Sequence, residues 1–339
     1  WWPWQEWIPR NCELALIMEK QVLVTHQLPG ERIHELGQRC DMNVWMGPGL
    51  LPAGGLREEL AGCHGLVCLL TDCIDRALLE AMPQLEFVSS MSVGVDHVDV
   101  NALTERGIPL GHTPGVLVDT TADTTFALML AAARRVREAD WFVRHGNWTA
   151  ENAWSPDFFV GKDVSGSTLG IVGLGAIGQA VARRAAAFGM EVLAWNRSPR
   201  QLSGVETVGL DELLARSDFV SLHVALSEET RGLIGARQIA AMKPGAVLVN
   251  TARGGIVDEQ ALADALHGDH LYAAALDVFE REPVAPDNPL LQLPNVVVAP
   301  HIGSATARTR ARMADLAAEN ALAALAGRPM PNCVNPQVY

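Results

Sequence analysis

The chain alternates short apolar runs with longer segments of helical character along most of its length. The runs are rich in Val, Leu, Ile and Ala, which is typical of parallel strands that are covered on both faces. This pattern predicts strands at 22–25, 66–71, 87–91, 168–172, 192–195, 219–223, 246–250, 273–278 and 296–299. Because helical segments separate the strands, the pattern favours an α/β fold built from parallel sheets.

A long helical region at 117–146 divides the predicted strands into two sets, so we expect two doubly wound parallel-sheet domains, Rossmann-like or flavodoxin-like. The most apolar part of this region, 126–133, is too short to cross a bilayer and is expected to be a core helix. The last predicted helix covers 304–327, with Ser304 as its N-cap and Gly327 as its stop. We expect that helix to return to the first domain.

The composition favours a globular protein that acts on small molecules. The chain has 339 residues, of which 49% are apolar, and it is longer than a domain with one hydrophobic core usually is. The net charge of −13 and the lack of a Lys/Arg-rich stripe disfavour nucleic acid and anionic membranes as partners. No apolar run reaches the roughly 18–20 residues that a membrane span needs. The scattered cysteines fit a reducing cytoplasm, so a cytoplasmic location is predicted.

The cysteines and the N-terminus add two further expectations. Cysteines at 12, 40, 63, 68, 73 and 333 match no common zinc spacing, so we predict no metal site and expect buried, reduced thiols. Residues 1–17 contain four tryptophans and precede Met18, where a strand-forming segment begins. We interpret 1–17 as a non-native or disordered extension, with a native N-terminal arm as the alternative.

A glycine-rich turn follows the predicted strand at 168–172. Its glycines, Gly173, Gly175 and Gly178, have the spacing of a dinucleotide-binding loop, and they lie between a strand and a helix as that motif requires. The first glycine permits a tight turn, the second admits a pyrophosphate, and the third lets the helix pack on the strand. The helix N-terminus then offers N–H groups to the phosphates.

The tip of the next predicted strand indicates which dinucleotide is bound. Many such domains carry an acid here, which accepts the ribose hydroxyls of NAD. This chain instead has Asn196, Arg197 and Ser198, with Arg200 as a weaker second cation. A guanidinium can bind the extra ribose phosphate of NADP(H) through charge-assisted hydrogen bonds. We therefore predict NADP(H) as the preferred cofactor and NAD(H) as an accepted one; a solvated surface arginine is the alternative.

Three successive strands of the second domain are followed by Arg253, Glu282 and His301. Ligands of parallel sheets bind at the carboxyl ends of the strands, so these side chains are expected to meet. The set suits reduction of a keto acid, with the imidazole as general acid, the carboxylate as its orienting partner and the guanidinium as the carboxylate-binding group. Glu280 competes with Glu282 for the orienting role, and each residue also has an alternative structural interpretation.

At these residues the chain resembles the D-isomer-specific 2-hydroxyacid dehydrogenase family. The segments GLGAIG, NTARGGIVDE, LDVFEREP and PHIGSAT occur together and in order, and the resemblance covers residues 19–330. Within the family, the segments SMSVGVDHVD, TPGVLVDTTAD and GRPMP are most similar to the glyoxylate/hydroxypyruvate reductase subgroup. The resemblance implies an active site in an interdomain cleft and a homodimer formed through the cofactor domain.

The resemblance also implies domain limits and site residues. It implies a discontinuous substrate-binding domain at 18–116 plus 302–339 and an NAD(P)-binding Rossmann domain at 117–301. Arg253, Glu282 and His301 would be catalytic, and substrate would also meet Val93, Gly94 and a neighbouring subunit's Trp154. For Trp154 a place in the dimer core is the alternative. Cofactor contacts are implied at Thr121, Gly173, Gly175, Ala176, Ile177, Gly178, Asn196, Arg197, Ser198, Thr251 and Asp277.

Together these features predict NADPH-dependent reduction of glyoxylate and hydroxypyruvate to glycolate and D-glycerate, by hydride transfer with a histidine as general acid. A reductase of bulkier 2-keto acids, such as 2-ketogluconate or phenylpyruvate, is the nearest alternative. A dinucleotide-sensing protein similar to the C-terminal-binding corepressors is an alternative from another class. Those proteins carry disordered tails, whereas this sequence ends soon after its last predicted helix.

Overall fold

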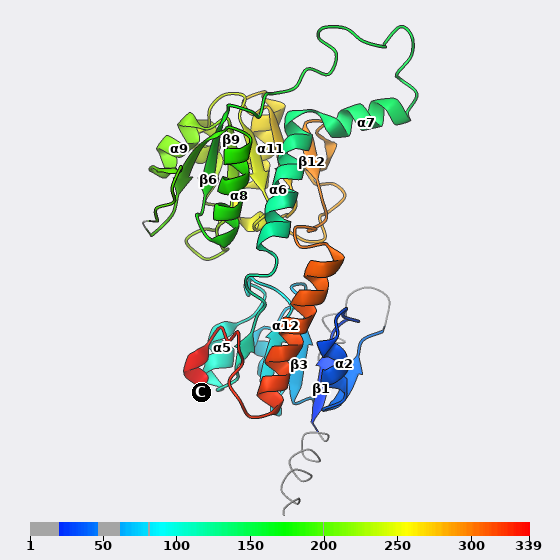
Figure 1. Cartoon of the computed structure of the whole chain (residues 1–339), viewed down its shortest axis with the longest axis vertical. Coiled ribbons are helices and arrows are strands. Elements are labelled where there is room, and N and C mark those ends of the chain that lie inside the picture. Colours follow the sequence, from blue (N-terminus) through cyan, green and yellow to red (C-terminus); the bar gives the residue numbers. More distant parts are fainter. Residues whose placement is uncertain (1–19, 47–61, 81, 199) are drawn as a thin grey trace, which may run out of the picture. The chain divides into compact units, whose positions relative to one another are not determined.

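The computed structural model describes residues 20–46, 62–80, 82–198 and 200–339. The chain divides into two compact units: unit 1 comprises Trp1–Leu117 and Thr306–Tyr339, and unit 2 comprises Val118–Ala305. Residues 1–17, which were interpreted from the sequence as an extension, lie outside the described residues. Each unit contains its own parallel sheet and its own buried core (Figure 1).

Unit 1 is built on a five-stranded parallel sheet in the order β2-β1-β3-β4-β5. This is the flavodoxin-like strand order of a doubly wound sheet. The strands are β1 (Gln21–Val24), β2 (Asp41–Val44), β3 (Gly65–Cys68), β4 (Phe87–Ser90) and β5 (Leu110–Gly111). The helices are α2 (Arg32–Gly37), α4 (Arg76–Glu80), α5 (Val100–Glu105) and α12 (Ala307–Leu325), with the 3-10 turn η3 (Pro336–Val338).

Alternate residues of the strands enter the two faces of this sheet. Val22 and Phe87 join the cluster beneath α2 and α12, whereas Leu23 and Val88 join the cluster beneath α4 and α5. A strand buried on both faces is apolar at most positions, which explains the apolar runs. Each fully buried Val, Leu or Ile side chain contributes roughly 1.5–3 kcal/mol through burial.

The last helix, α12, lies against the sheet of unit 1. The hydroxyl of Ser89 on β4 donates to the carbonyl of Ala317 over 2.8 Å, and the amide of Asn320 donates to the carbonyl of His112 over 2.9 Å. The predicted N-cap, Ser304, is wrong: Thr306 caps the helix and accepts from the N–H of Thr309. Ser and Thr are both good caps, so composition alone could not choose between them.

Unit 2 contains a seven-stranded parallel sheet in the order β12-β11-β10-β9-β6-β7-β8, and the order reverses between β6 and β9. This is the dinucleotide-binding arrangement with one additional strand. The strands are β6 (Thr168–Val172), β7 (Glu191–Trp195), β8 (Glu206–Thr207), β9 (Phe219–Leu222), β10 (Val247–Asn250), β11 (Ala273–Leu276) and β12 (Val296–Val298). Each of the nine apolar runs in the sequence thus contains a strand, and the predicted fold class is confirmed.

Helices cover both faces of this sheet. Helices α6 (Val118–Ala133) and α8 (Ala176–Ala187) pack on one face, and α9 (Leu210–Arg216), α10 (Ala236–Ala241) and α11 (Glu259–His267) pack on the other (Figure 1). The helical region expected at 117–146 is two helices, because the chain turns at Arg135 with φ of 54° before α7 (Val136–Arg144). The 3-10 turns η1 (Gly254–Ile256) and η2 (Pro289–Gln292) complete the unit.

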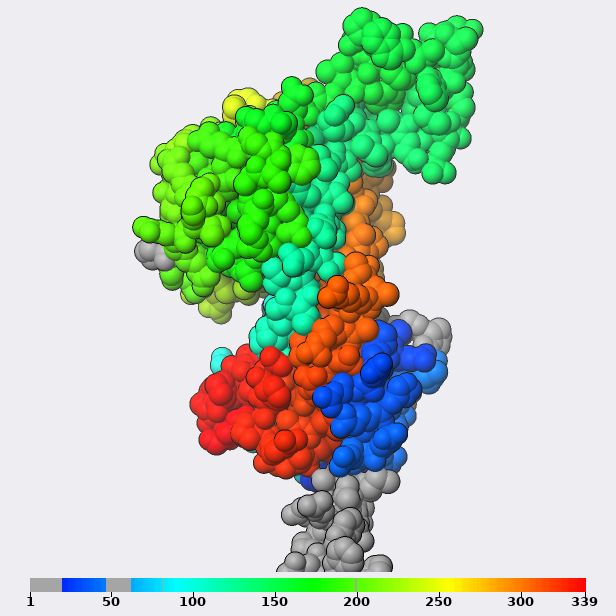
Figure 2. All heavy atoms as spheres, viewed as in Figure 1, coloured from blue at the N-terminus to red at the C-terminus, as the bar shows by residue number. Residues whose placement is uncertain are grey.

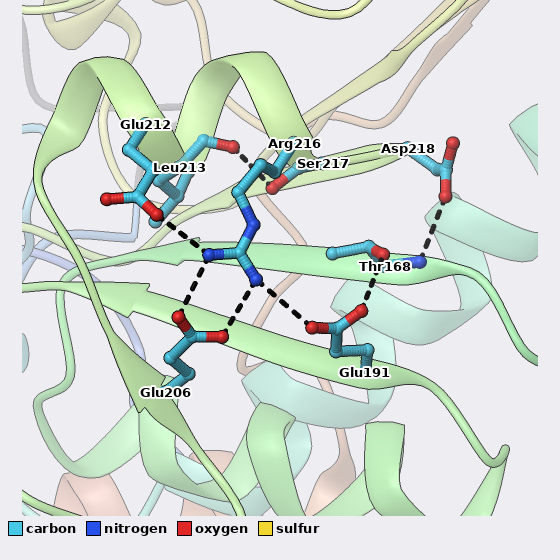
Figure 3. A network of polar contacts seen from close by, with 8 residues as sticks. All are labelled: Thr168, Glu191, Glu206, Glu212, Leu213, Arg216, Ser217 and Asp218. Atoms are coloured by element: carbon cyan, nitrogen blue, oxygen red, sulfur yellow. Dashed lines mark hydrogen bonds and ion pairs between the residues drawn. The ribbon is translucent and has the colours of Figure 1, made fainter.

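The short edge strand β8 is tied to its neighbours by Arg216 at the end of α9 (Figure 3). The guanidinium contacts Glu206 and Glu212 over 2.8 Å each and Glu191 over 3.2 Å. The hydrogen bond from Arg216 lowers the pKa of Glu206. These pairs lie on the surface, so they hold the edge in register more than they add stability.

The expectation that the cysteines are buried holds for only some of them. All five in the described part of the chain are free, but only Cys40, Cys63 and Cys68 are buried, and Cys73 is exposed. Among the described residues no group of three or more His, Cys, Asp or Glu could hold a metal ion. No helix in the described ranges combines the length and the apolar character that crossing a membrane requires.

Candidate active site

The turn between β6 and α8 has the properties that its three glycines predict. Gly173 has φ of 104°, and a Cβ there would lie 2.6 Å from the carbonyl oxygen of His223. A Cβ on Gly178 would lie 2.1 Å from the carbonyl oxygen of Gly173, so only glycine lets α8 pack this closely. A Cβ on Gly175 would meet nothing within 4 Å. The backbone is therefore open to a ligand at the middle glycine.

The start of α8 can hold a phosphate. Gly175 is its N-cap, in extended conformation and without a side-chain hydrogen bond, and Ala176 and Ile177 form the first turn. An uncapped helix N-terminus presents N–H groups and the positive end of the helix dipole. This open turn and uncapped helix fit the pyrophosphate of a dinucleotide.

The tip of β7 is organised by Asn196. Its Oδ1 accepts from the N–H of Leu174 in the glycine turn over 3.0 Å, and its Nδ2 donates to the carbonyl of Ser198 over 2.7 Å. Both polar atoms of Asn196 are therefore engaged within the protein. The exposed guanidinium of Arg197 contacts Glu229 over 3.2 Å, and Arg200 donates to the carbonyl of Leu174 over 3.4 Å.

His301 and Glu282 meet at the carboxyl edge of the sheet. Nδ1 of His301 lies 2.7 Å from Oε2 of Glu282, and the N–H of Phe279 donates to the other carboxylate oxygen over 3.1 Å. This second contact fixes the carboxylate plane. An imidazole that donates from Nδ1 to a carboxylate presents Nε2 for chemistry.

The backbone around His301 is held by Asp277. The two oxygens of this buried carboxylate accept from the N–H groups of Ile302 and Gly303, each over 2.7 Å. The backbone carbonyl of Asp277 accepts from the N–H of His301. Burial raises the pKa of Asp277, and these N–H donors oppose the rise. His301 itself has φ of 55°, a left-handed conformation that histidine adopts more readily than most residues. Asp277 thus fixes an unusual turn that aims the imidazole.

Arg253 lies in the turn after β10. The side chain of Asn250 shapes this turn, since its Nδ2 donates to the carbonyl of Arg253 and its Oδ1 accepts from the N–H of Ala252. The next residue, Gly254, packs on the chain after β11, where a Cβ would lie 1.8 Å from the carbonyl carbon of Phe279. This close approach brings the Arg253 turn against the segment that carries Glu282.

The three ionisable groups influence one another. Burial raises the pKa of Glu282, but the hydrogen bond and charge of His301 and the charge of Arg253 outweigh it, so the pKa is lowered overall. Glu282 is therefore an anion at neutral pH. Glu280, the competing carboxylate, instead accepts from the N–H of Glu259 at the start of α11. The structure thus brings together Arg253, Glu282 and His301, and it directs Glu280 elsewhere.

Two threonines predicted to contact the cofactor lie on adjacent elements. The hydroxyl of Thr251, after β10, is 2.8 Å from that of Thr125 on α6, and Thr125 also donates to the carbonyl of Thr121. Thr121 approaches the His301 turn, because a Cβ on Gly303 would lie 3.4 Å from it. Both threonines are buried.

Val93 and Gly94 lie in unit 1, in the loop after β4. Both of their backbone carbonyls form hydrogen bonds. Nδ1 of His112 lies 3.1 Å from the carbonyl oxygen of Val93, and the hydroxyl of Ser92 donates to the carbonyl oxygen of Gly94 over 2.7 Å. Among the described residues no hydrogen bond uses the N–H of Val93 or Gly94. Two neighbouring free N–H groups can bind an anion.

Trp154 lies in a projecting segment of unit 2. This arm comprises residues 136–160, which include α7, and it extends away from the rest of its unit (Figure 2). The side chain of Trp154 is 78% exposed. Within the single chain this side chain is therefore not part of the buried core.

Comparison with known proteins decides the family. Residues 126–303 match the family model of the D-isomer specific 2-hydroxyacid dehydrogenase, NAD binding domain. The glyoxylate reductase of Korarchaeum cryptofilum is 48% identical over 325 residues, which is 95% of this chain and 97% of the relative.

The chain belongs to the D-isomer specific 2-hydroxyacid dehydrogenase family.

Solved structures of other proteins agree with this assignment. The TT0316 protein from Thermus thermophilus is similar with a TM-score of 0.87 and 48% identity, covering 93% of this chain and 99% of that one. An NADPH-dependent glyoxylate/hydroxypyruvate reductase from Sinorhizobium meliloti, in complex with NADP and malonate, has a TM-score of 0.84 and 32% identity, with coverage of 94% and 98%. As a member of this dehydrogenase family, the chain is an NAD(P)-dependent oxidoreductase.

The sequence did not reveal several residues that shape this dehydrogenase site. Asn250 forms the Arg253 turn, and His112 and Ser92 hold the Val93 loop. Asn250 directly follows a buried strand, and that position was the one signal that could have indicated it. His112 could not be found, because its partner lies 19 residues away along the chain.

Proposed function

We propose that this enzyme reduces glyoxylate and hydroxypyruvate to glycolate and D-glycerate, with NADPH as the preferred cofactor. The observation that carries the proposal is the His301–Glu282 contact of 2.7 Å, formed beside Arg253 at the carboxyl edge of a dinucleotide-binding sheet. An imidazole that is oriented by an anionic carboxylate is suited to general acid–base catalysis.

Each residue has a distinct task in this proposal. A nicotinamide dinucleotide, when bound, supplies the hydride. Nε2 of His301 holds the proton that the carbonyl oxygen of the keto acid receives, and Glu282 stabilises the imidazolium before that transfer. Arg253 binds the carboxylate of the keto acid as a planar cation and polarises its carbonyl.

The preference for NADPH depends on the tip of β7. Residues 196–198 include no acid, and Arg197 and Ser198 offer a cation and a hydroxyl to a ribose phosphate. The Sinorhizobium meliloti relative is named as NADPH-dependent. Binding of NADH is also expected, since the glycine turn and the start of α8 contact the part that both dinucleotides share.

A steady-state panel tests this proposal. Glyoxylate and hydroxypyruvate are expected to give kcat/KM at least about tenfold above 2-ketogluconate and phenylpyruvate, because bulky substituents must be accommodated in a site for small acids. With either small acid as substrate, kcat/KM should be higher with NADPH than with NADH. Higher kcat/KM with the bulky acids would support the alternative reductase, and no turnover with any of the four would refute the proposed activity.

We also propose a homodimer formed through the arm at 136–160. Trp141, Trp148 and Trp154 on the arm are 56%, 60% and 78% exposed, and large aromatic side chains gathered on one projecting segment are typical of interfaces. Trp154 would lie either in the core of this dimer or beside the substrate of the second copy.

Analytical ultracentrifugation is expected to give twice the mass of one chain. Trp148→Asp should shift the equilibrium toward the monomer by at least about tenfold, because it places a charge in an apolar interface. The matched control is Met46→Asp in unit 1, which also replaces an exposed apolar side chain, 71% accessible. A monomeric native protein, or a Trp148→Asp variant that dimerises as well as the control, would contradict the proposal.

A further inference from the structure

An ion pair bridges the two loops that flank the glycine turn. Nη1 of Arg197, which follows β7, lies 3.2 Å from Oε2 of Glu229, which lies in the loop after β9. In the sheet β6 lies between β7 and β9. The pair therefore spans the carboxyl end of the strand that leads into the glycine turn.

Glu229 is held in place by its own loop. Its Oε2 accepts from the hydroxyl of Ser227 over 2.9 Å. The loop is closed by Thr230, whose hydroxyl donates to the carbonyl of Ala225 over 2.6 Å and accepts from the N–H of Ser227 over 2.8 Å. The carboxylate is thus bound by its own loop as well as by Arg197.

The position of Glu229 has a consequence for the choice of cofactor. A ribose phosphate that binds Arg197 must compete with Glu229 for the guanidinium, and it then lies close to a second negative charge. Like charges at this separation repel even at the high dielectric of a surface. NADH carries no phosphate at this position, so neither effect opposes its binding.

We propose that Glu229 is a specificity-determining residue, which limits the preference for NADPH by competing for Arg197. The proposal rests on the proposed role of Arg197 as the ribose-phosphate cation. It also gives a physical reason why the enzyme should accept both dinucleotides: the Glu229 carboxylate partly neutralises the cation that binds the phosphate.

Dissociation constants measured by fluorescence titration of the full chain test the proposal without reference to turnover. Glu229→Gln retains an acceptor for Ser227 but removes the charge, so the Kd for NADPH should fall about 3- to 10-fold. The Kd for NADH should change by less than about twofold. The neighbouring Glu228→Gln is the matched control and should change neither constant.

A double-mutant cycle with Arg197→Met then identifies the mechanism. In the Arg197→Met background, the gain from Glu229→Gln should be smaller than in the native background, because no guanidinium remains to be released and only the direct repulsion between carboxylate and phosphate is relieved. An unchanged NADPH/NADH ratio in Glu229→Gln would overturn the inference while Arg197 retains its role. An Arg197→Met variant that binds NADPH as well as the native protein would overturn the proposed cofactor preference itself.

Discussion

His301→Asn is expected to lower kcat for glyoxylate reduction by about 10²–10⁴, which is the usual contribution of a positioned general acid. Asparagine is chosen because it removes Nε2 and retains two other properties of the residue. Its amide can still donate to Glu282 in place of Nδ1, and asparagine tolerates the left-handed backbone that His301 adopts at φ of 55°. What it lacks is any group in place of Nε2.

The measurement is kcat at saturating NADPH and glyoxylate, with the Kd for NADPH determined separately. That Kd should stay within about twofold of the native value, because the pyrophosphate-binding turn is untouched. Retention of kcat within about tenfold would show that another group supplies the proton. A loss of cofactor binding together with kcat would instead point to a structural role for the His301 turn.

The fold was predictable because its determinants are local. A strand covered on both faces is mostly apolar, so each buried strand of three or more residues left a visible run. The three strands that the sequence did not reveal are either partly exposed or very short. β2 is a half-exposed edge strand with the sequence DMNV, and β5 and β8 contain two residues each. Their pairing depends on the neighbouring strand and not on their own composition.

The composition of the candidate site was also visible, but not its internal geometry. Parallel strands end at one edge, so Arg253, Glu282 and His301 could be expected to lie together. The choice between Glu280 and Glu282 depends on how the chain turns after β11, and the structure shows it through the contacts of each carboxylate. The residue types in this segment do not indicate which of the two carboxylates the turn directs toward His301.

Long-range partners explain the remaining gap. The exposed Arg197 was readable as a cation at the strand tip, yet its partner Glu229 lies 32 residues later on a different loop. Asp277 was expected beside the cofactor, and the structure adds that its carboxylate accepts from the N–H groups of Ile302 and Gly303, which no residue pattern indicated. Such pairings follow from the packing of the sheet, so they emerge only from coordinates.

Arg253→Met is expected to lower kcat/KM for glyoxylate by about 10²–10³, the loss that follows removal of one preorganised group that stabilises developing charge. Methionine retains the length and packing of the side chain but carries no charge. Part of the loss should appear in KM, because the guanidinium also binds the ground-state keto acid. Arg253→Lys should recover only part of the activity, since an ammonium cannot form a planar fork.

The same variant has an expected effect on the pH profile. The charge of Arg253 helps to lower the pKa of Glu282, so its removal should raise that pKa. Activity that requires the ionised carboxylate would then be lost at a higher pH in Arg253→Met than in the native enzyme, and Arg253→Lys should restore the native position. An unshifted acid limb in Arg253→Met, with full kcat/KM, would mean that the guanidinium acts neither on the substrate nor on Glu282. The His301–Glu282 pair would then have to work without a neighbouring cation, and a different group would have to bind the carboxylate of the keto acid.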